Sequence, residues 1–262
     1  MGSISKARSS PLVSIITVVY NSEHLIEKTI CSIINQTCDD YEYIVIDGGS
    51  KDGTLDIIRK YGSFISQWIS EPDQGIYDAM NKALSMASGR YVWFINSGDR
   101  VYDSYVVEKL RSCYDKSKPD IMYGETMLVE ENGEIIGLRS SRTTRKLPRK
   151  LSDKSMIYGM VVSHQSFIPR LALADKFDLT YKCSSDLDWA IRCLRKAKTV
   201  VNMEMILSWY LVGGYSYKNQ KMSWKERWKI YTRYYGCIPT LFAHIRIIGR
   251  GIQHRIIEGK NY

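Results

Sequence analysis

The chain has 262 residues, a formal net charge of +9, and ordinary shares of hydrophobic (44%) and charged (25%) residues. No apolar run approaches the roughly 18 residues of a transmembrane helix, which excludes a spanning helix in this sequence. The opening residues MGSISKARSS lack the apolar core of a signal peptide, so we expect residues 1–10 to be a disordered lead. None of the six cysteines forms a C-x-x-C pair, which argues against a zinc site and favours reduced thiols in a cytoplasm.

The positive charge is concentrated toward the C-terminus. Residues 218–262 hold ten Lys and Arg against two Glu, and a second basic cluster lies between Arg139 and Lys154. This asymmetry indicates an anionic partner: a nucleic acid, a membrane surface or a phosphorylated substrate.

The first hundred residues alternate between strand and helix patterns. Strands are predicted over 12–20, 41–46, 64–69 and 91–95, and helices over 22–36, 52–61 and 76–87. This order predicts a parallel sheet with right-handed crossovers. Three of the strands lead into polar residues, namely Asn21, Asp47 and Asp99. Open α/β sheets bind ligands at this edge, which makes the three residues candidates for a nucleotide and metal site.

After Asp99 the pattern changes. A helix is predicted over 104–114, and a hairpin over 120–129 and 134–141 with Asn132-Gly133 as its turn. A strong amphipathic helix over 184–196 and a strand over 199–211 follow. The last forty residues read as two basic amphipathic helices, split at Gly236 and Pro239.

Seven short stretches carry a resemblance to a known family. They are SIITVVYN (14–21), IDGGSKDGT (46–54), SEPDQGIYDAMNKA (70–83), FINSGD (94–99), HQSF (164–167), SSDLDW (184–189) and GGYS (213–216). Each is weak alone, but their ordered combination is specific. The chain resembles family 2 glycosyltransferases of the GT-A fold, and in particular the bacterial enzymes that build surface polysaccharides.

The resemblance implies an α/β fold with a Rossmann-like, mostly parallel central sheet flanked by helices. It also implies inverting transfer of a sugar from a nucleotide diphosphate donor, with UDP as the default nucleotide. We therefore expect a GT-A catalytic domain over 11–216, with a nucleotide-binding half at 11–103 and an acceptor half at 104–216. A basic amphipathic helical extension over 217–262 would follow.

The resemblance also supplies candidate donor-binding residues. Asp47 is expected to accept hydrogen bonds from the base or ribose, and Tyr20 to stack on the base. Asp73 suits the hydroxyl groups of the donor sugar. The full set is Thr17, Tyr20, Asn21, Asp47, Asp73, Gln74, Ser97, Gly98, His164 and Gly214. Each has a plainer alternative: Thr17 as core, Asp47 as a turn residue, His164 as a structural hydrogen-bonding residue, and Gly214 as a plain turn.

The predicted metal ligand is Asp99. Family members often carry Asp-x-Asp, whereas this chain reads Asn96-Ser97-Gly98-Asp99, so only the last carboxylate is present. Because Mg²⁺ often takes one or two carboxylates together with phosphate oxygens and water, Mg²⁺ or Mn²⁺ remains the expected cofactor. The alternative for Asp99 is a turn or helix-cap residue.

The predicted catalytic base is Asp186. Sugar transfer needs a proton removed from the acceptor hydroxyl, and the SSDLDW stretch offers Asp186 and Asp188. Residues two apart on a helix point to different faces. Asp186 fits the family's base position, with a helix N-terminal carboxylate as its alternative. Asp188 is interpreted as a helix N-terminal carboxylate or a partner of Arg192.

Two other functions compete with this hypothesis. A sugar nucleotidyltransferase would show a Gly-rich phosphate loop after the first strand, where this chain has Val19-Tyr20-Asn21-Ser22. A nucleic-acid-binding protein would explain the basic charge, but no nucleic-acid motif is present, so we expect no nucleic-acid partner.

The final helix predicts contact with an anionic membrane. One face carries Leu241, Phe242, Ile245, Ile248, Ile252 and Ile256, and another carries Arg246, Arg250 and His254. Apolar and basic faces in one helix are typical of interfacial helices. We therefore expect a cytoplasmic enzyme, peripheral on the inner face of the membrane, with an undecaprenyl-diphosphate-linked glycan acceptor. The alternative is a helix whose apolar face packs on the catalytic domain.

Overall fold

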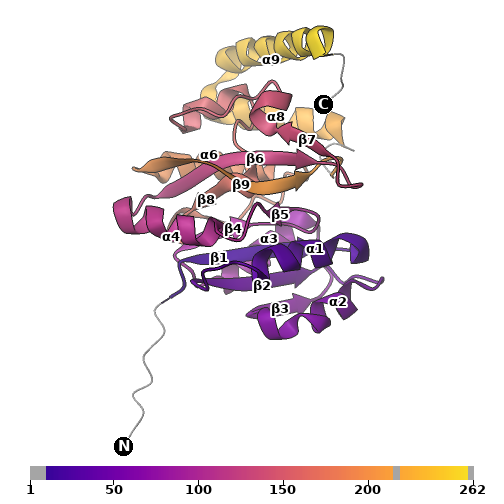
Figure 1. The fold of residues 1–262 in the computed structure, drawn as a ribbon. Helices are drawn as coiled ribbons and strands as arrows, with labels where there is room; N and C mark the ends of the chain where they lie inside the picture. The colour runs from indigo at the N-terminus through magenta and orange to yellow at the C-terminus, as the bar shows by residue number, and fades with distance from the viewer. Residues whose placement is uncertain (1–9, 215–218, 259–262) are drawn as a thin grey trace, which may run out of the picture.

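The structure is a computed structural model that describes residues 10–214 and 219–258. The predicted lead, apart from residue 10, lies outside this range, and so do Tyr215 and Ser216 of the GGYS stretch. Strands and helices alternate through the first half of the chain (Figure 1). The strands are β1 (Val13–Val19), β2 (Tyr41–Asp47), β3 (Gln67–Ser70), β4 (Tyr91–Phe94), β5 (Arg100–Val101), β6 (Ile121–Val129), β7 (Ile135–Leu138), β8 (Phe167–Pro169) and β9 (Val200–Leu211). The helices are α1 (Glu23–Ile34), α2 (Thr54–Lys60), α3 (Ile76–Met86), α4 (Val106–Ser117), α5 (Arg139–Arg142), α6 (Ser185–Lys196), α8 (Gln220–Tyr235) and α9 (Cys237–Glu258), with short 3₁₀ turns η1 (Gly62–Phe64), η2 (Asp153–Tyr158), η3 (His164–Ser166) and η4 (Leu171–Leu173).

Two sheets form the framework. The first is entirely parallel, in the order β3-β2-β1-β4, as the strand-helix alternation predicts. The second is mixed, in the order β5-β9-β6-β7, with β8 paired to β6. There β6 and β9 run parallel, and the other pairs are antiparallel. An isolated bridge between Tyr91 and Arg170 connects the two sheets.

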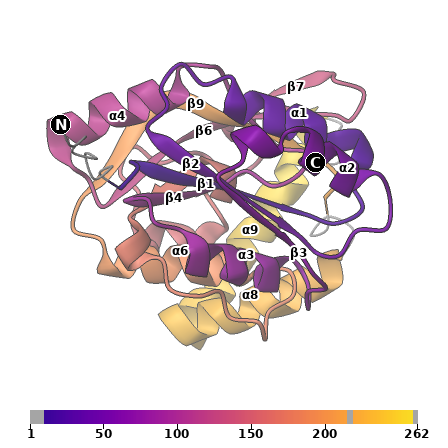
Figure 2. The ribbon, with the colours of Figure 1, turned by 90° about the horizontal axis from the view of Figure 1, so that it is seen from below.

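Helices cover both faces of the parallel sheet, which is why its strands are continuously apolar. Figure 2 shows α1 and α4 on one side of the strands, and α3, α6 and α8 on the other. Apolar residues of β1 alternate between the two cores: Ile15 packs with the α1 side and Ile16 with the α3 and α6 side.

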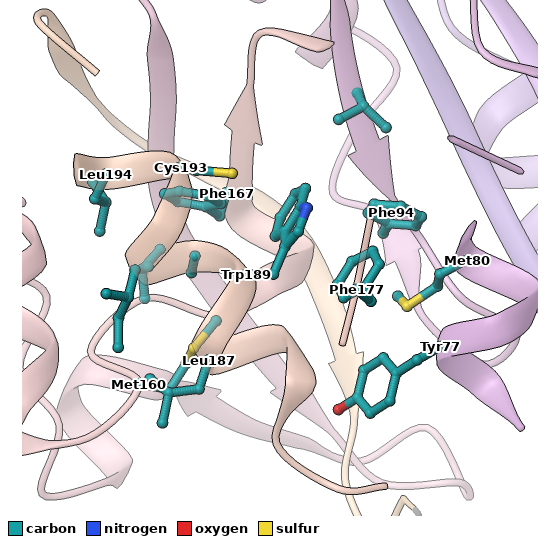
Figure 3. Packing of buried hydrophobic residues seen from close by; sticks show 14 of the residues in the cluster. Tyr77, Met80, Phe94, Met160, Phe167, Phe177, Leu187, Trp189, Cys193 and Leu194 are labelled. Carbon is teal, nitrogen blue, oxygen red and sulfur yellow. The ribbon is translucent and has the colours of Figure 1, made fainter. Parts of the chain in front are cut away.

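An aromatic cluster fixes α6 in place. Trp189 stacks on Phe177 with ring centroids 4.9 Å apart, and Phe94 and Phe167 meet it edge-on at 5.7 and 5.9 Å (Figure 3). These rings come from β4, β8, α6 and the segment before α6, so they tie α6 to the strands. The first turn of α6, which contains Asp186, is therefore held at a defined position.

Some predicted element boundaries are wrong. β3 begins at Gln67 rather than at residue 64, because Gly62–Phe64 forms a 3₁₀ turn. The hairpin of β6 and β7 is present with Gly133 at φ 90°, but β7 ends at Leu138, where α5 begins. The terminal helices divide at Gly236 alone, since Pro239 lies in the first turn of α9, where proline is tolerated.

The two C-terminal helices differ in how they pack. α8 buries Ile230 and Tyr231 in the same core as α6. The predicted domain boundary at residue 216 stays a prediction, but α8 beyond it packs on the core that contains α6. α9 rests on α8 through a narrow face that includes the buried residues Ala243 and His244.

The outward face of α9 is apolar and uncovered. Its exposed side chains, between 50% and 72% accessible, are Ile238, Leu241, Phe242, Ile245, Ile248 and Ile252. The side chains of His254 and Ile256 lie outside the described part of the chain. None of the described helices is long and apolar enough to cross a membrane.

Candidate functional site

Loops at the carboxyl ends of β1, β2 and β4 meet at one edge of the parallel sheet. Asn21 links the first two loops, because its backbone N–H donates to Ser50 Oγ at 2.8 Å and its side-chain oxygen accepts from the Lys51 N–H at 2.8 Å. The hydroxyl groups of Ser22 and Ser97 lie 2.8 Å apart and join the first loop to the loop after β4. The polar strand ends predicted from the sequence are therefore neighbours in space.

Asp47 and Thr17 lie below this edge rather than on it. The Asp47 side chain is fully buried, and its carboxylate accepts from the N–H groups of Gly49 and Ser50 and from the Ser70 hydroxyl. Its described partners lie in the loop after β2 and at the end of β3, so it fixes that loop against β3. The Thr17 hydroxyl donates to the Ile95 carbonyl at 2.7 Å inside the core. We therefore do not propose Thr17 as a ligand contact.

A more accessible group of residues lies above Asp47. The Tyr20 side chain is 62% exposed and lies beside Gly48. A Cβ on Gly48 would fall 2.4 Å from Asp73 Oδ2, so the absence of a side chain lets the Asp73 carboxylate approach the backbone. Asp73 in turn accepts from the Gly75 N–H at 2.8 Å. Gln74 is exposed, and its N–H donates to Asp78 Oδ2 at 3.1 Å.

Asp99 is buried at the start of the mixed sheet. Its carboxylate accepts from Gln165 Nε2 at 2.7 Å and from the Leu211 N–H at 3.0 Å. Burial raises the pKa of Asp99 to about 6, against the opposing effects of the Gln165 hydrogen bond and the nearby His164. Gly98 precedes it with φ +96°, a left-handed conformation that favours glycine.

His164 connects the Asp99 loop to α6. Its Nε2 lies 3.3 Å from Asn96 Nδ2, and its Nδ1 lies 3.6 Å from Asp186 Oδ2. An Nε2 that accepts from the Asn96 amide leaves the ring proton on Nδ1, where it faces Asp186. The neighbouring Gln165 is the residue that contacts Asp99. The HQSF stretch thus bridges the predicted metal ligand and the predicted base.

Asp186 and Asp188 have different surroundings, although they are two residues apart. The Asp186 side chain is 23% exposed and accepts from the Tyr77 hydroxyl at 3.2 Å. Burial acts to raise the pKa of Asp186, but the hydrogen bond and charge of His164, helped by Arg227, hold it below the ordinary value. Asp188 is 1% exposed and accepts from Arg192 Nε at 2.8 Å and the Tyr234 hydroxyl at 2.7 Å.

These surroundings distinguish the two carboxylates chemically. Asp186 is ionised at neutral pH and partly accessible, as a general base must be. Asp188 joins α6 to α8 and has the character of a structural residue. The assignment of the base to Asp186 remains a prediction.

The oxygen atoms near Asp99 fit a metal that arrives with its ligand. Among the described residues, no group of three or more His, Cys, Asp and Glu is placed to hold a cation. However, Asn96 Oδ1 is buried without a hydrogen-bond partner in the described structure. An amide oxygen and a carboxylate are hard donors of the kind that Mg²⁺ and Mn²⁺ prefer, with phosphate and water completing the shell.

Gly214 is the last described residue before the gap. A Cβ added to it would lie 3.6 Å from the Tyr210 hydroxyl.

Sequence reasoning missed several residues of this site. Gln165 stands next to His164 in a stretch that the sequence marks, so its position was a usable signal. Asn96 was noted only as a departure from Asp-x-Asp. Tyr77 carries no local signal, because its contact with Asp186 joins helices 109 residues apart in the chain.

Comparisons with known proteins identify the family and the fold. The profile of the family described as "Glycosyl transferase family 2" matches residues 14–175. A PGL/p-HBAD biosynthesis glycosyltransferase of Mycobacterium bovis is 27% identical over 210 residues, covering 77% of each chain. An uncharacterized glycosyltransferase of Mycobacterium tuberculosis is 31% identical over 189 residues, covering 70% of this chain and 69% of the relative.

Two solved structures share the fold at low sequence identity. Residues 1–349 of S. aureus TarS in complex with UDP-GlcNAc superpose with a TM-score of 0.68 at 18% identity, covering 94% of this chain and 74% of TarS. The mannosyltransferase PcManGT of Pyrobaculum calidifontis, in complex with GDP-Man and Mn²⁺, gives a TM-score of 0.62 at 14% identity, covering 95% and 76%. Both likenesses concern the GT-A architecture alone.

Proposed function

The chain belongs to glycosyl transferase family 2. On that premise we propose that it is an inverting enzyme that moves the sugar of a UDP-sugar donor to a hydroxyl group of a glycan acceptor. Family membership decides against the sugar nucleotidyltransferase and nucleic-acid-binding alternatives. The observation that carries the proposal is the placement of Asp186 beside His164, across the HQSF stretch from Asp99. The proposed base and the proposed diphosphate-binding edge lie on opposite sides of the HQSF stretch. This suits a single displacement, in which the acceptor attacks from one side and the diphosphate leaves on the other.

In this mechanism Asp186 takes the proton of the acceptor hydroxyl while the oxygen attacks the anomeric carbon. The bond from that carbon to the diphosphate oxygen breaks on the opposite side, which inverts the configuration. The lowered pKa of Asp186 keeps the carboxylate ready to accept a proton at neutral pH. His164 and Tyr77 hold its two oxygens in orientation.

The donor is proposed to lie along the exposed part of the strand-end edge. Tyr20 offers an accessible ring for the base, and Asp73 offers a carboxylate for the sugar hydroxyls. Asp99 and the Asn96 amide oxygen would hold Mg²⁺ or Mn²⁺, whose charge neutralises the leaving diphosphate. UDP is preferred because TarS was solved with UDP and with UDP-GlcNAc.

The acceptor is proposed to be a glycan on a polyprenyl diphosphate such as undecaprenyl diphosphate, as in surface polysaccharide synthesis. The support is the apolar outward face of α9, flanked by basic residues, including Arg246. Exposed patches of this kind mark interaction sites, and this pattern suits an anionic membrane. The enzyme would then act in the cytoplasm, on the inner face of the cell membrane.

Nucleotide binding tests the donor part of the proposal. The melting temperature of the protein would be measured with UDP, GDP or CDP, each with and without Mn²⁺. UDP with Mn²⁺ should stabilise the fold most, by about 2.7 kcal/mol at a hundredfold excess over Kd. A larger shift with GDP would overturn the choice of nucleotide, and no shift with any nucleotide would contradict the proposed site.

A further inference from the structure

Three arginines gather near Asp186 and form no salt bridge in the described structure. Arg139 begins α5, Arg145 follows α5, and Arg227 lies on α8. The charges of Arg227 and Arg139 both act on Arg145, and the carboxylates that act on Arg139 are Glu125 first and then Asp186. Other charged side chains of the described residues pair with one another, but no salt bridge among them involves these three arginines.

Backbone groups and close packing hold the arginines in this position. The Arg139 guanidinium donates to the carbonyls of Val161, at 3.2 Å, and Met160. Arg145 passes so near Gly159 that a Cβ there would lie 3.4 Å from its Nε. The cluster is thus built into the fold rather than being a loose surface patch.

Arg227 is placed by its neighbour on α8. The buried Glu226 carboxylate accepts from the N–H groups of Lys182 and Cys183 at 2.7 and 2.9 Å. These two residues immediately precede the SSDLDW stretch, so the contact sets α8 against the loop that leads to Asp186. Arg227 Nε is nevertheless buried with no hydrogen-bond partner in the described structure, and so is the Tyr231 hydroxyl one turn later.

Gathering these cations has an energetic cost that the described contacts offset only in part, through the two carbonyls at Arg139 and the nearby Glu125 and Asp186. Burial lowers the pKa of Arg139 to about 10 and, with the repulsion of Arg227 and Arg139, that of Arg145 to about 9. Buried charges and buried donors without partners destabilise a fold. An anion that accepted hydrogen bonds from the three guanidinium groups would remove both costs.

The cluster also lies on a line of contacts from Asp186 to the apolar face of α9. Arg246 and Arg250 of α9 stand over the ring of Tyr158, at 5.2 and 5.9 Å from its centroid. Tyr158 directly precedes Gly159, which packs against Arg145. Basic side chains therefore extend from the face of α9 that meets Tyr158 toward the predicted base.

We propose that Arg139, Arg145 and Arg227 form the binding site for the diphosphate of a lipid-linked acceptor. The inference rests on the proposed function and adds a recognition site to it. Guanidinium groups bind phosphate oxygens in pairs, with geometric selectivity. The lipid would extend toward the exposed face of α9, and the first sugar beyond the diphosphate would present its hydroxyl to Asp186.

Isothermal titration of the full-length protein tests the site. The probes are farnesyl diphosphate, farnesol, inorganic diphosphate, and UDP with Mn²⁺. Arg145→Gln and Arg227→Gln should each weaken farnesyl diphosphate binding by about 10- to 100-fold, as expected for charge-assisted hydrogen bonds. Arg227→Lys, which keeps the charge, should lose less. Lys221→Gln removes one positive charge from an exposed position of α8 and should leave the affinity for farnesyl diphosphate unchanged.

The pattern across probes identifies the ligand. The proposal requires that UDP affinity stay unchanged in the arginine variants, and that farnesyl diphosphate bind more tightly than inorganic diphosphate and farnesol. Equal loss of UDP affinity would assign the arginines to the donor and overturn the proposal. Unchanged farnesyl diphosphate binding in all the arginine variants would also overturn it. If inorganic diphosphate bound as tightly as farnesyl diphosphate, the site would not recognise a lipid-linked ligand, which would contradict the proposal as well. Wild-type protein that binds farnesyl diphosphate but no nucleotide would refute the proposed function and leave this site standing.

Discussion

Separate replacement of Asp186 and Asp188 should show that one carboxylate is needed for sugar transfer and the other for the stability of the fold. The two residues share a helix turn and a charge, so Asp186→Asn and Asp188→Asn are matched changes. We expect Asp186→Asn to remove most transfer and leave the fold intact. Asp188→Asn should instead destabilise the protein while its folded fraction keeps its activity.

The expected sizes follow from the contacts. An asparagine at 186 keeps an oxygen for the Tyr77 hydroxyl and loses the carboxylate charge that faces His164 Nδ1 at 3.6 Å. Because that pair is partly exposed, the stability change should stay within about 1 kcal/mol. Loss of a general base lowers the rate by ~10²–10⁴-fold, which is roughly 3–5 kcal/mol of barrier.

At Asp188 the balance is reversed. Its carboxylate is 1% exposed and accepts short hydrogen bonds from Arg192 and Tyr234. Breaking a buried pair costs about 3 kcal/mol at the lower end, which corresponds to a fall in melting temperature of roughly 10 °C for a chain of this size.

The assay combines UDP release from a UDP-sugar with thermal melting of the same preparations. UDP binding with Mn²⁺ serves as the control that the donor site is intact in both variants. If Asp186→Asn keeps near-wild-type transfer while Asp188→Asn loses it without unfolding, the base has been assigned to the wrong carboxylate.

Other substitutions test the remaining parts of the site. Because the pKa of Asp99 is raised to about 6, the folded protein binds this proton more tightly than the unfolded chain, so stability falls as pH rises from about 4 to 6. In EDTA, denaturant titrations should show the free energy of unfolding of Asp99→Asn gaining about 2 kcal/mol relative to wild type between pH 4 and pH 6. A difference that does not change with pH would refute a raised pKa at Asp99. Gly48→Ala should push the Asp73 carboxylate aside and raise the KM for the donor with little change in melting temperature, whereas an unchanged KM would remove Asp73 from the donor site. Replacing Phe242 and Ile245 together by serine should weaken binding to phosphatidylglycerol-rich vesicles, measured by sedimentation, by about tenfold or more. The melting temperature should not change, because both side chains are exposed. Unaltered sedimentation would contradict the membrane proposal.

The sequence predicts the framework of this molecule well because the framework depends on local pattern. Continuous apolar runs gave the parallel strands, and Asn132-Gly133 gave the hairpin turn. The strand ends also placed Asn21 and Asp99 at a common edge, since parallel strands share one direction. Helical spacing predicted that Asp186 and Asp188 point to different faces, but the choice of Asp186 as the base came from the resemblance and stays a prediction.

What the sequence could not predict depends on long-range contacts. Asp47 ends a strand just as Asp99 follows one, yet Ser50 and Ser70 occupy its oxygens and it lies in the core. Arg139 and Arg227 are 88 positions apart and appear in the sequence as separate basic segments. Only the packing of α8 against the loop before Asp186, through Glu226, brings them together.

The most direct test of the account is transfer itself, measured with the full-length protein, Mn²⁺, a panel of radiolabelled UDP-sugars and a bacterial membrane lipid fraction as acceptor. The account predicts that one UDP-sugar transfers its label to lipid-extractable material, with equal release of UDP, and that Asp186→Asn abolishes both. Absence of UDP release and of label transfer from every UDP-sugar, in a protein that binds none of them, would contradict it.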